Sequence, residues 1–281
     1  ESRNVLQSLL RTAVKGSSCA EDPLADNLSL QMVPFEIFSK SAASDRNPQR
    51  HSLDRVMLQY AADWPLSLVL TPAALSHYSE IFTYLLRLRR AGFALRDVWL
   101  GLKAIDKATQ ISNRTGSRRF LSPVNAPRLR QLELFLREAM HFHTIVTAFM
   151  NTQLLVVAWH KFTKELNLAQ DLFEIQNAHA RYVADCISRS MMRDDHKQLR
   201  HIINQALQAI LDFRSHLDRL SAPAYLEDDL VYLHLQQTHQ AFRQRTQFMY
   251  RMLKSVAMQG THLASLFVQL NFNNFYDQMH C

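Results

Sequence analysis

One helical pattern, from Leu129 to Leu166, constrains the fold of this chain more than any other feature. Apolar side chains recur along it at helical spacing, at Leu132, Phe135, Ala139, Phe142, Val146, Phe149 and Val156. At a rise of about 1.5 Å per residue, an unbroken helix of this length would extend for roughly 57 Å. The pattern therefore predicts a bundle that contains a very long helix.

The scarcity of turn-forming residues supports the same fold class. The 281 residues include five glycines and eight prolines, whereas β-sandwiches and dinucleotide-binding folds use glycine in many turns. Helical patterns predict further helices at 1–18, 72–90, 93–107, 171–190, 195–220 and 226–257. We therefore expect an all-α, elongated helical bundle with a basic inter-helix loop and little or no β structure.

The segments between these helices are expected to be irregular. Residues 19–54 are rich in Ser, Pro, Asp and Asn, and their part at 39–52 is predicted to be a flexible loop. The second predicted flexible loop, at 108–127, is the basic one, and it carries Gly116, Pro123 and Pro127.

The charge balance indicates an acidic partner. A formal net charge of +7 and a pI near 9.5 suit nucleic acid, a membrane surface or an acidic protein, and charge alone does not choose among them. Cys19, Cys186 and Cys281 are scattered, which favours a reducing compartment. No apolar run reaches the roughly 18 to 20 residues that span a bilayer. Because the first residue is Glu1 and no signal-like stretch follows, we expect a fragment of a larger protein.

The sequence contains no complete catalytic or metal-binding motif. Glu138-x-x-His141 matches half of a di-iron bundle site, but no second Glu-x-x-His exists in the chain. Lys15-Gly16-Ser17 lacks the glycine spacing and the strand of a phosphate-binding loop. His179 is better explained as a buried, hydrogen-bonded residue than as a ligand. We therefore expect no enzyme activity, no cofactor and no metal site.

Four ordered motifs give the chain a family resemblance. In the first, Tyr60 precedes Trp64-Pro65-Leu66 in a short β-prone or extended run, which Thr71-Pro72 ends as a helix begins. The helix that follows carries Tyr78, Ile81, Phe82, Leu85, Leu86, Arg87 and Arg89, with Leu95 and Trp99 beyond them.

The other motifs are Met140-His141-Phe142 with Val157 and Trp159, then His179-x-x-Tyr182 with Ile187, and finally Leu266…Leu270-Asn271-Phe272-Asn273-Asn274-Phe275-Tyr276. Together the four motifs resemble the C-terminal domain of the gamma-tubulin complex proteins, over most of the chain from about Leu53 to Tyr276. The pattern suits the larger, divergent members of the component-six type. It departs from the family at Gln269 and Asn271, where the family has Arg and Asp.

This resemblance implies a non-catalytic helical domain that holds one gamma-tubulin molecule in the gamma-tubulin ring complex, which supports microtubule nucleation. It also implies other gamma-tubulin complex subunits as partners, and a location in the cytoplasm at the centrosome or another microtubule organising centre. No membrane partner is expected. Two alternatives stay open, a basic helical nucleic-acid-binding domain and a structural scaffold without tubulin contact. The nucleic-acid alternative has no recognition motif in its favour.

Two groups of residues are candidates for partner contact. Arg114, Arg118 and Arg119 lie in the basic loop, which is either a solvated insertion or a binding element. Because tubulins are acidic, a basic surface would be complementary and would speed encounter. Asn271, Asn273, Asn274 and Tyr276 either order the C-terminal turn or line a partner surface. The family motif itself is expected to lie largely in the core.

Overall fold

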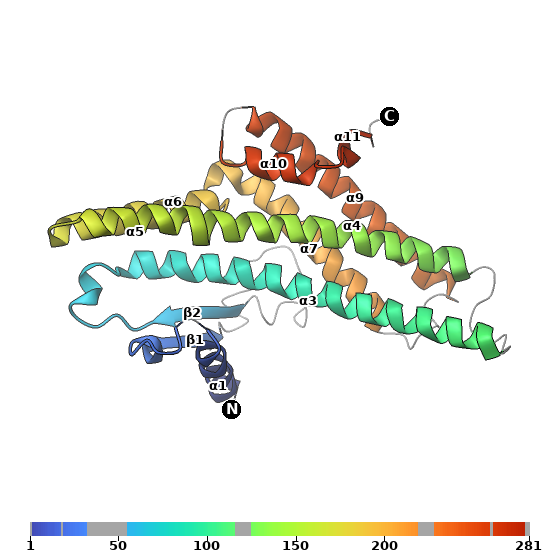
Figure 1. Cartoon of the computed structure of the whole chain (residues 1–281), viewed down its shortest axis with the longest axis horizontal. Coiled ribbons are helices and arrows are strands. Elements are labelled where there is room, and N and C mark those ends of the chain that lie inside the picture. Colours follow the sequence, from blue (N-terminus) through green and yellow to red (C-terminus); the bar gives the residue numbers. More distant parts are fainter. Residues whose placement is uncertain are drawn as a thin grey trace. The chain divides into compact units, whose positions relative to one another are not determined.

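A computed structural model describes residues 2–17, 19–32, 55–115, 125–218, 228–258 and 261–278. The chain divides into two compact units, each made of two separate stretches. Unit one comprises Glu1–Arg87 and Gln153–Ser190, and unit two comprises Leu88–Thr152 and Met191–Cys281. The described secondary structure is almost entirely helical, which confirms the all-α class (Figure 1). The predicted loop at 39–52 and residues 116–124 of the predicted basic loop lie outside the described residues.

Unit one combines helices with a small sheet. Its N-terminal elements are α1 (Ser2–Lys15), the short 3-10 helix η1 (Ala25–Asn27), β1 (Leu28–Met32), β2 (Val56–Tyr60) and η3 (Leu66–Leu68). Its later elements are α5 (Trp159–Leu168) and α6 (Leu172–Arg189), which pack against each other. The long helix α3 (Pro72–Thr115) begins in this unit.

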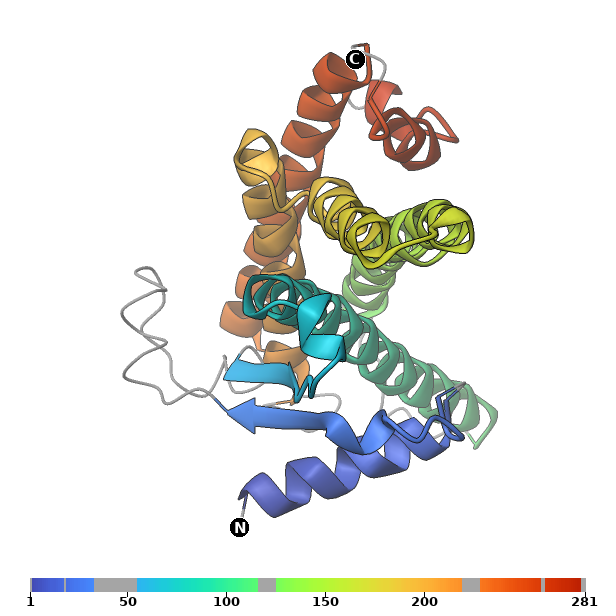
Figure 2. The same ribbon diagram turned by 90° about the vertical axis from the view of Figure 1, so that its left-hand side faces the viewer.

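The sheet of unit one has two antiparallel strands. Leu28 pairs with Tyr60 and Met32 pairs with Val56. Figure 2 shows β1 between β2 and α1, and the Gln7 side chain of α1 donates a hydrogen bond to the Leu28 carbonyl at 3.0 Å. β2 confirms the β-prone run as far as Tyr60, whereas Leu66–Leu68, expected to be extended, form the 3-10 helix η3. β1 corrects the expectation that 19–54 is irregular throughout, because its partner strand lies 28 residues further along and no local pattern marks the pairing.

Helix α3 corrects two further expectations. It runs as one helix from Pro72 to Thr115, where two helices and the start of a loop were predicted. Gly92, in the gap between the two predicted helices, lies in regular helix, because a single glycine weakens a helix by only about 1 kcal/mol. Residues 108–115 are therefore helical, and α4 (Asn125–Asn151) starts before the predicted end of the loop, with Pro127 in its first turn.

Unit two is assembled from long helices around an aromatic core. After part of α3 and α4 come the short η5 (Asp194–His196), then α7 (Lys197–Asp218), α9 (Asp229–Ala257), α10 (Ala264–Leu270) and α11 (Phe275–Gln278). α9 packs on α7 and α10. Phe135 contacts both Phe213 and Phe242, with ring centroids 4.2 and 5.5 Å apart. The aromatic side chains of Phe135, Phe142, Phe149, Phe242 and Tyr250 are buried, whereas Phe248 is exposed.

The long helical pattern from Leu129 is confirmed, with one local change of geometry. Residues Thr152–Ala158 form a π-helical segment, η4, between α4 and α5. A π-helical segment places more residues in each turn than an α-helix, so it rotates the face that follows. The buried residues of the segment are Gln153, Leu154 and Ala158, and Val156, expected in the apolar stripe, is exposed instead.

One described helix, Ala126–Leu168, is long and apolar enough to cross a membrane by length and composition alone. The best window of 18 residues has a mean hydropathy of 1.3, although no uninterrupted apolar run was evident in the sequence. The core helix of a bundle passes the same test. Here Phe142, Val146 and Phe149 are almost completely buried within unit two, and this packing accounts for part of the apolar composition.

Candidate partner-binding surfaces

The C-terminal turn brings the predicted asparagines and Tyr276 together. The Asn271 side chain donates to Asp277 Oδ2 at 2.7 Å and accepts from the Tyr276 backbone N–H at 3.2 Å. Asn273 accepts from the Phe275 backbone N–H at 3.3 Å. Asn274 has a φ of 56°, in the left-handed region that asparagine tolerates better than most residues. The asparagines thus satisfy the backbone of a tight turn.

Tyr250 of α9 fixes this turn to the bundle. Its hydroxyl donates to Asp277 Oδ1 at 2.7 Å, and its ring stacks on that of Tyr276 with centroids 5.3 Å apart. Burial and the hydrogen bond to Asp277 raise the pKa of Tyr250 to about 12. Burial likewise raises the pKa of Tyr276 to about 12. Sequence reasoning missed Asp277, whose only signal was an acidic side chain six residues after Asn271.

The turn also has an outward face. Phe272 is 86% exposed, and Asn273, Asn274 and Val268 are exposed beside it in the sequence. Tyr276 is buried, so its ring serves the packing of the turn. Each of the two roles considered for this motif therefore fits different residues. Asn271 and Tyr276 order the turn, whereas Asn273 and Asn274 face solvent, as a partner surface requires.

The basic loop is only partly described. Arg114 lies in the last turn of α3, and its side chain, together with Arg118 and Arg119, lies outside the described residues. Arg128, in the first turns of α4, forms an ion pair with Asp229 and lies over the Tyr232 ring, 4.7 Å from its centroid. Arg128 is therefore engaged within unit two rather than free for a partner.

Glu138, which with His141 matches half of a di-iron site in the sequence, takes part in an ion-pair cluster. His239 Nε2 lies 2.8 Å from Glu138 Oε2, and Arg243 donates to both carboxylate oxygens, from Nε at 2.8 Å and from Nη2. Burial alone would raise the pKa of Glu138, but the hydrogen bonds from Arg243 and His239 outweigh it and lower the pKa. His141 lies 3.5 Å from the Leu270 carbonyl. Among the described residues, no group of three potential metal ligands occurs.

His179 forms a hydrogen-bonded pair with Tyr78 inside unit one. It is buried, and its Nε2 lies 2.9 Å from the Tyr78 hydroxyl, which donates to it when the imidazole is neutral. Burial lowers the pKa of His179, against a hydrogen bond to the Val69 backbone. Burial raises the pKa of Tyr78, and the nearby Cys186 adds to this effect. These contacts confirm the expectation of a hydrogen-bonded histidine.

The other motif residues are less buried than expected. All three tryptophans are exposed: Trp64 by 81%, Trp159 by 52% and Trp99 by 39%. Tyr60, Leu66, Phe82, Arg87 and His141 are half-buried, Pro65 is exposed, and Phe142 is fully buried. The expectation that the motif is largely core is therefore wrong for its tryptophans and for Phe272. Sequence alone did not separate them, because an aromatic residue at helical spacing suits a core and an interface equally well.

Unit one has a set of exposed apolar side chains in the segment before α3 and around the start of α6. We call it the apolar tip, and it comprises Trp64, Leu68, Leu168, Leu172 and Phe173. The Gln176 side chain joins its two parts by donating to the Leu68 carbonyl at 2.8 Å. Three exposed carboxylates, Asp63, Asp171 and Glu174, lie within a residue or two of it in the sequence. Exposed apolar patches of this kind mark protein contacts.

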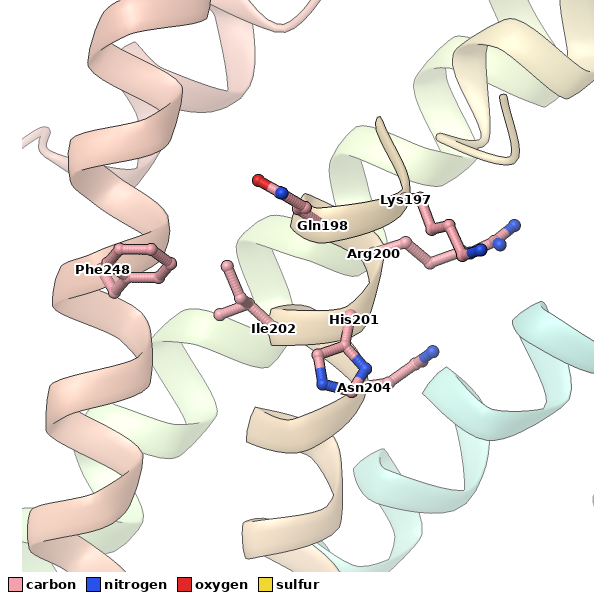
Figure 3. Close-up of a pocket in the computed structure, with 7 residues that line it drawn as sticks. All are labelled: Lys197, Gln198, Arg200, His201, Ile202, Asn204 and Phe248. Carbon is pink, nitrogen blue, oxygen red and sulfur yellow. The ribbon is translucent and has the colours of Figure 1, made fainter. Parts of the chain in front are cut away.

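Unit two has a hollow of about 600 Å³ between α7 and α9, which we call the α7–α9 hollow. Figure 3 shows Phe248 of α9 facing Ile202 of α7, while Lys197 and Arg200 extend away from Phe248. Arg200 donates to the Met192 carbonyl at 3.3 Å, and His201 is hydrogen-bonded to Gln205. Two of its polar side chains, those of Arg200 and His201, are thus engaged by the protein itself, whereas Asn204 Oδ1 has no hydrogen-bond partner among the described residues.

Comparison with known proteins gives consistent matches. Residues 1–276 match the family model "Gamma tubulin complex component C-terminal". The chain is 31% identical to mouse gamma-tubulin complex component 6 over 281 residues, which is 97% of this chain and 15% of the relative. It is 29% identical to Arabidopsis thaliana gamma-tubulin complex component 3 over 217 residues, 76% of this chain and 24% of the relative. The chain thus spans between about a seventh and a quarter of the length of these relatives.

Proposed function

The chain belongs to the gamma-tubulin complex component family by its C-terminal domain, and from this premise we propose that it is a non-catalytic module that binds gamma-tubulin. In this role it is part of a gamma-tubulin ring complex that supports microtubule nucleation. Its partners are gamma-tubulin and other subunits of the complex. Its location is the cytoplasm, at the centrosome or another microtubule organising centre.

The observation that supports binding most directly is the exposure of all three tryptophans. Tryptophan is enriched at binding hot spots, because its large surface is favourable only when a partner covers it. Trp64, Trp99 and Trp159 are also residues of the family motif. Aromatic side chains that are exposed in the folded domain are better explained by contact with another molecule than by a contribution to the stability of the fold.

Among the predicted contact residues, Arg114, Arg118, Arg119, Asn273 and Asn274 remain proposed contacts. Asn271 and Tyr276 support this contact indirectly, since they hold the turn that displays Asn273 and Asn274. The positive charge of the chain suits the acidic surface of a tubulin and would speed encounter.

The nucleic-acid alternative receives less support. A nucleic-acid-binding domain rests on net charge alone, and the relatives are named as gamma-tubulin complex components.

Co-purification of the 281-residue chain with gamma-tubulin tests the proposal. We expect a one-to-one complex on size-exclusion chromatography at near-physiological salt that persists at moderately raised salt. A folded, monodisperse chain that fails to bind at either salt concentration would contradict the proposal. Retention of RNA or DNA with a steep salt dependence would favour the nucleic-acid alternative.

A further inference from the structure

Helices α3 and α4 enclose a groove of about 480 Å³ within unit two, which we call the α3–α4 groove. Residues of both helices line it, among them Arg89, Phe93, Arg96, Trp99, Met140 and His143. Most of its lining surface is apolar. Phe93 is 57% exposed and Met140 is 40% exposed, and Trp99 is exposed beside them. The groove therefore presents two aromatic rings and a flexible thioether to solvent.

Gly92 and His143 bring the two helices close together at the floor of this groove. His143 Nε2 donates to the Leu88 carbonyl of α3 at 2.8 Å. A Cβ added at Gly92 would lie 2.8 Å from His143 Cε1, so glycine leaves the space that the imidazole fills. Burial lowers the pKa of His143, which keeps the ring neutral in this position. The floor is thus fixed by contacts that do not involve the exposed aromatic residues.

Cations flank the apolar lining. Arg89, Phe93, Arg96 and Lys103 follow at intervals of three, four or seven residues and so share a face of α3. Lys103 Nζ lies 4.3 Å from the Trp99 ring centroid, which adds a cation–π contact. Among the residues that the structure describes, no carboxylate lies within ion-pairing distance of Arg89 or Arg96. The neighbouring Asp97 is paired instead with Arg214, at 2.9 Å.

The two other candidate surfaces differ from this groove in charge. The apolar tip is accompanied by Asp63, Asp171 and Glu174, which would repel an acidic partner. The α7–α9 hollow has one exposed aromatic side chain, Phe248, and its Arg200 is bonded to the protein backbone. Of these three surfaces, the α3–α4 groove is the one that combines several exposed apolar side chains with cations, Arg89 and Arg96, that have no carboxylate partner in the described part of the chain. Such a surface suits an acidic segment that carries a bulky apolar side chain.

We propose that the α3–α4 groove receives an acidic segment of gamma-tubulin, with an apolar side chain of that segment seated against Phe93, Trp99 and Met140. Arg89 and Arg96 pair with its carboxylates. This inference rests on the proposed function, and it assigns that function to one surface of this chain. Of these side chains, Arg89, Trp99 and Met140 belong to the family motif, whereas Phe93 and Arg96 do not.

The test is the affinity of purified gamma-tubulin for the immobilised 281-residue chain, measured for wild type and three variants. The double variant Arg89→Glu/Arg96→Glu reverses the charge of the groove. Met140→Glu places a carboxylate inside it, at an exposed position that tolerates a polar side chain. The control Lys164→Glu/Lys197→Glu makes the same change of net charge at two exposed lysines outside the groove. Far-UV circular dichroism and thermal unfolding verify that each variant is folded.

We expect both groove variants to weaken binding at least tenfold, and the control to stay within twofold of wild type. If wild type binds but both groove variants also stay within twofold, the groove is not the docking site, although the proposed function stands. An equal loss in the control would overturn the assignment as well, since net charge would then explain the effect. Failure of wild type itself to bind would contradict the proposed function and with it the occupant of the groove.

Discussion

The C-terminal turn and the α3–α4 groove both contain charged and aromatic side chains, which contact one another in the turn but are exposed in the groove. In the turn, Asp277 accepts hydrogen bonds from Tyr250 and Asn271, and the aromatic rings of Tyr250 and Tyr276 stack on each other. In the groove, Arg89 and Arg96 have no described carboxylate partner, and Phe93 is exposed. Polar and aromatic groups that satisfy one another stabilise a fold, whereas unsatisfied ones at a surface are available to a partner.

This difference predicts that the free energy of unfolding and the affinity for gamma-tubulin respond to substitutions in different places. Substitutions in the turn and in the bundle core should lower the free energy of unfolding. Substitutions at the groove should lower affinity for gamma-tubulin at nearly constant stability. The following predictions are ordered by the size of the expected effect on stability, from largest to smallest.

Tyr276→Ala should cost about 3–5 kcal/mol of unfolding free energy, because it removes a buried ring and leaves a cavity against Tyr250. Urea denaturation monitored by circular dichroism measures this loss. Tyr276→Phe is the matched control and should retain most of the stability. A loss below 1 kcal/mol for Tyr276→Ala would show that the turn does not pack as described.

Glu138→Gln should cost about 1–3 kcal/mol at neutral pH, since it removes the charged acceptor of His239 and Arg243. The pKa of Glu138 is lowered below its ordinary value of 4.5 in the folded state. Its stabilising contribution is therefore complete above about pH 4.5 and is lost as the pH falls through the lower folded pKa.

Wild type and Glu138→Gln should thus differ most at pH 6–7 and converge as the solution is acidified below pH 4. Denaturation curves at several pH values test this. A difference in stability that stays constant from pH 7 to pH 3 would show that folding does not lower the pKa of Glu138.

Tyr250→Phe should cost about 0.5–1.5 kcal/mol, because it removes the hydroxyl that donates to Asp277 while keeping the stacked ring. In the same variant, gamma-tubulin affinity should stay within twofold of wild type. Thermal unfolding and binding measured on one preparation test both statements. A large loss of affinity with unchanged stability would show that the Tyr250 hydroxyl acts in binding rather than in the packing of the turn.

Phe93→Ser gives the smallest expected change in stability, within about 0.5 kcal/mol, because its side chain is largely exposed. Its affinity for gamma-tubulin should nevertheless fall several-fold, since the ring is one of the proposed apolar contacts. The reverse result, lower stability with unchanged affinity, would show that Phe93 belongs to the fold.

Much of the fold follows from periodicity. The spacing of Phe135, Phe142 and Phe149 predicted a buried helical face, and the structure buries all three. Periodicity failed where the geometry changed. The π-helical segment rotates the helix after Thr152, so Val156 faces solvent. Two separate helices were predicted on either side of Gly92, but the helix is continuous there, and the glycine leaves room for the imidazole of His143.

The candidate sites were less predictable, since their character depends on contacts between distant residues. The asparagines at 271–274 were identified from the sequence, but their role depended on Asp277 and on Tyr250, 21 residues before Asn271. The α3–α4 groove joins side chains about 45 residues apart, and a sequence does not show which of its aromatic residues are exposed. Trp99 was assigned to the core for this reason.

The most direct test of the central claim is the dissociation constant of gamma-tubulin measured side by side for wild type, Arg89→Glu/Arg96→Glu and the lysine control. The account predicts stable binding by wild type, at least a tenfold loss for the arginine pair and no more than a twofold change for the control. Equal affinities for all three proteins, with each shown to be folded, would contradict it.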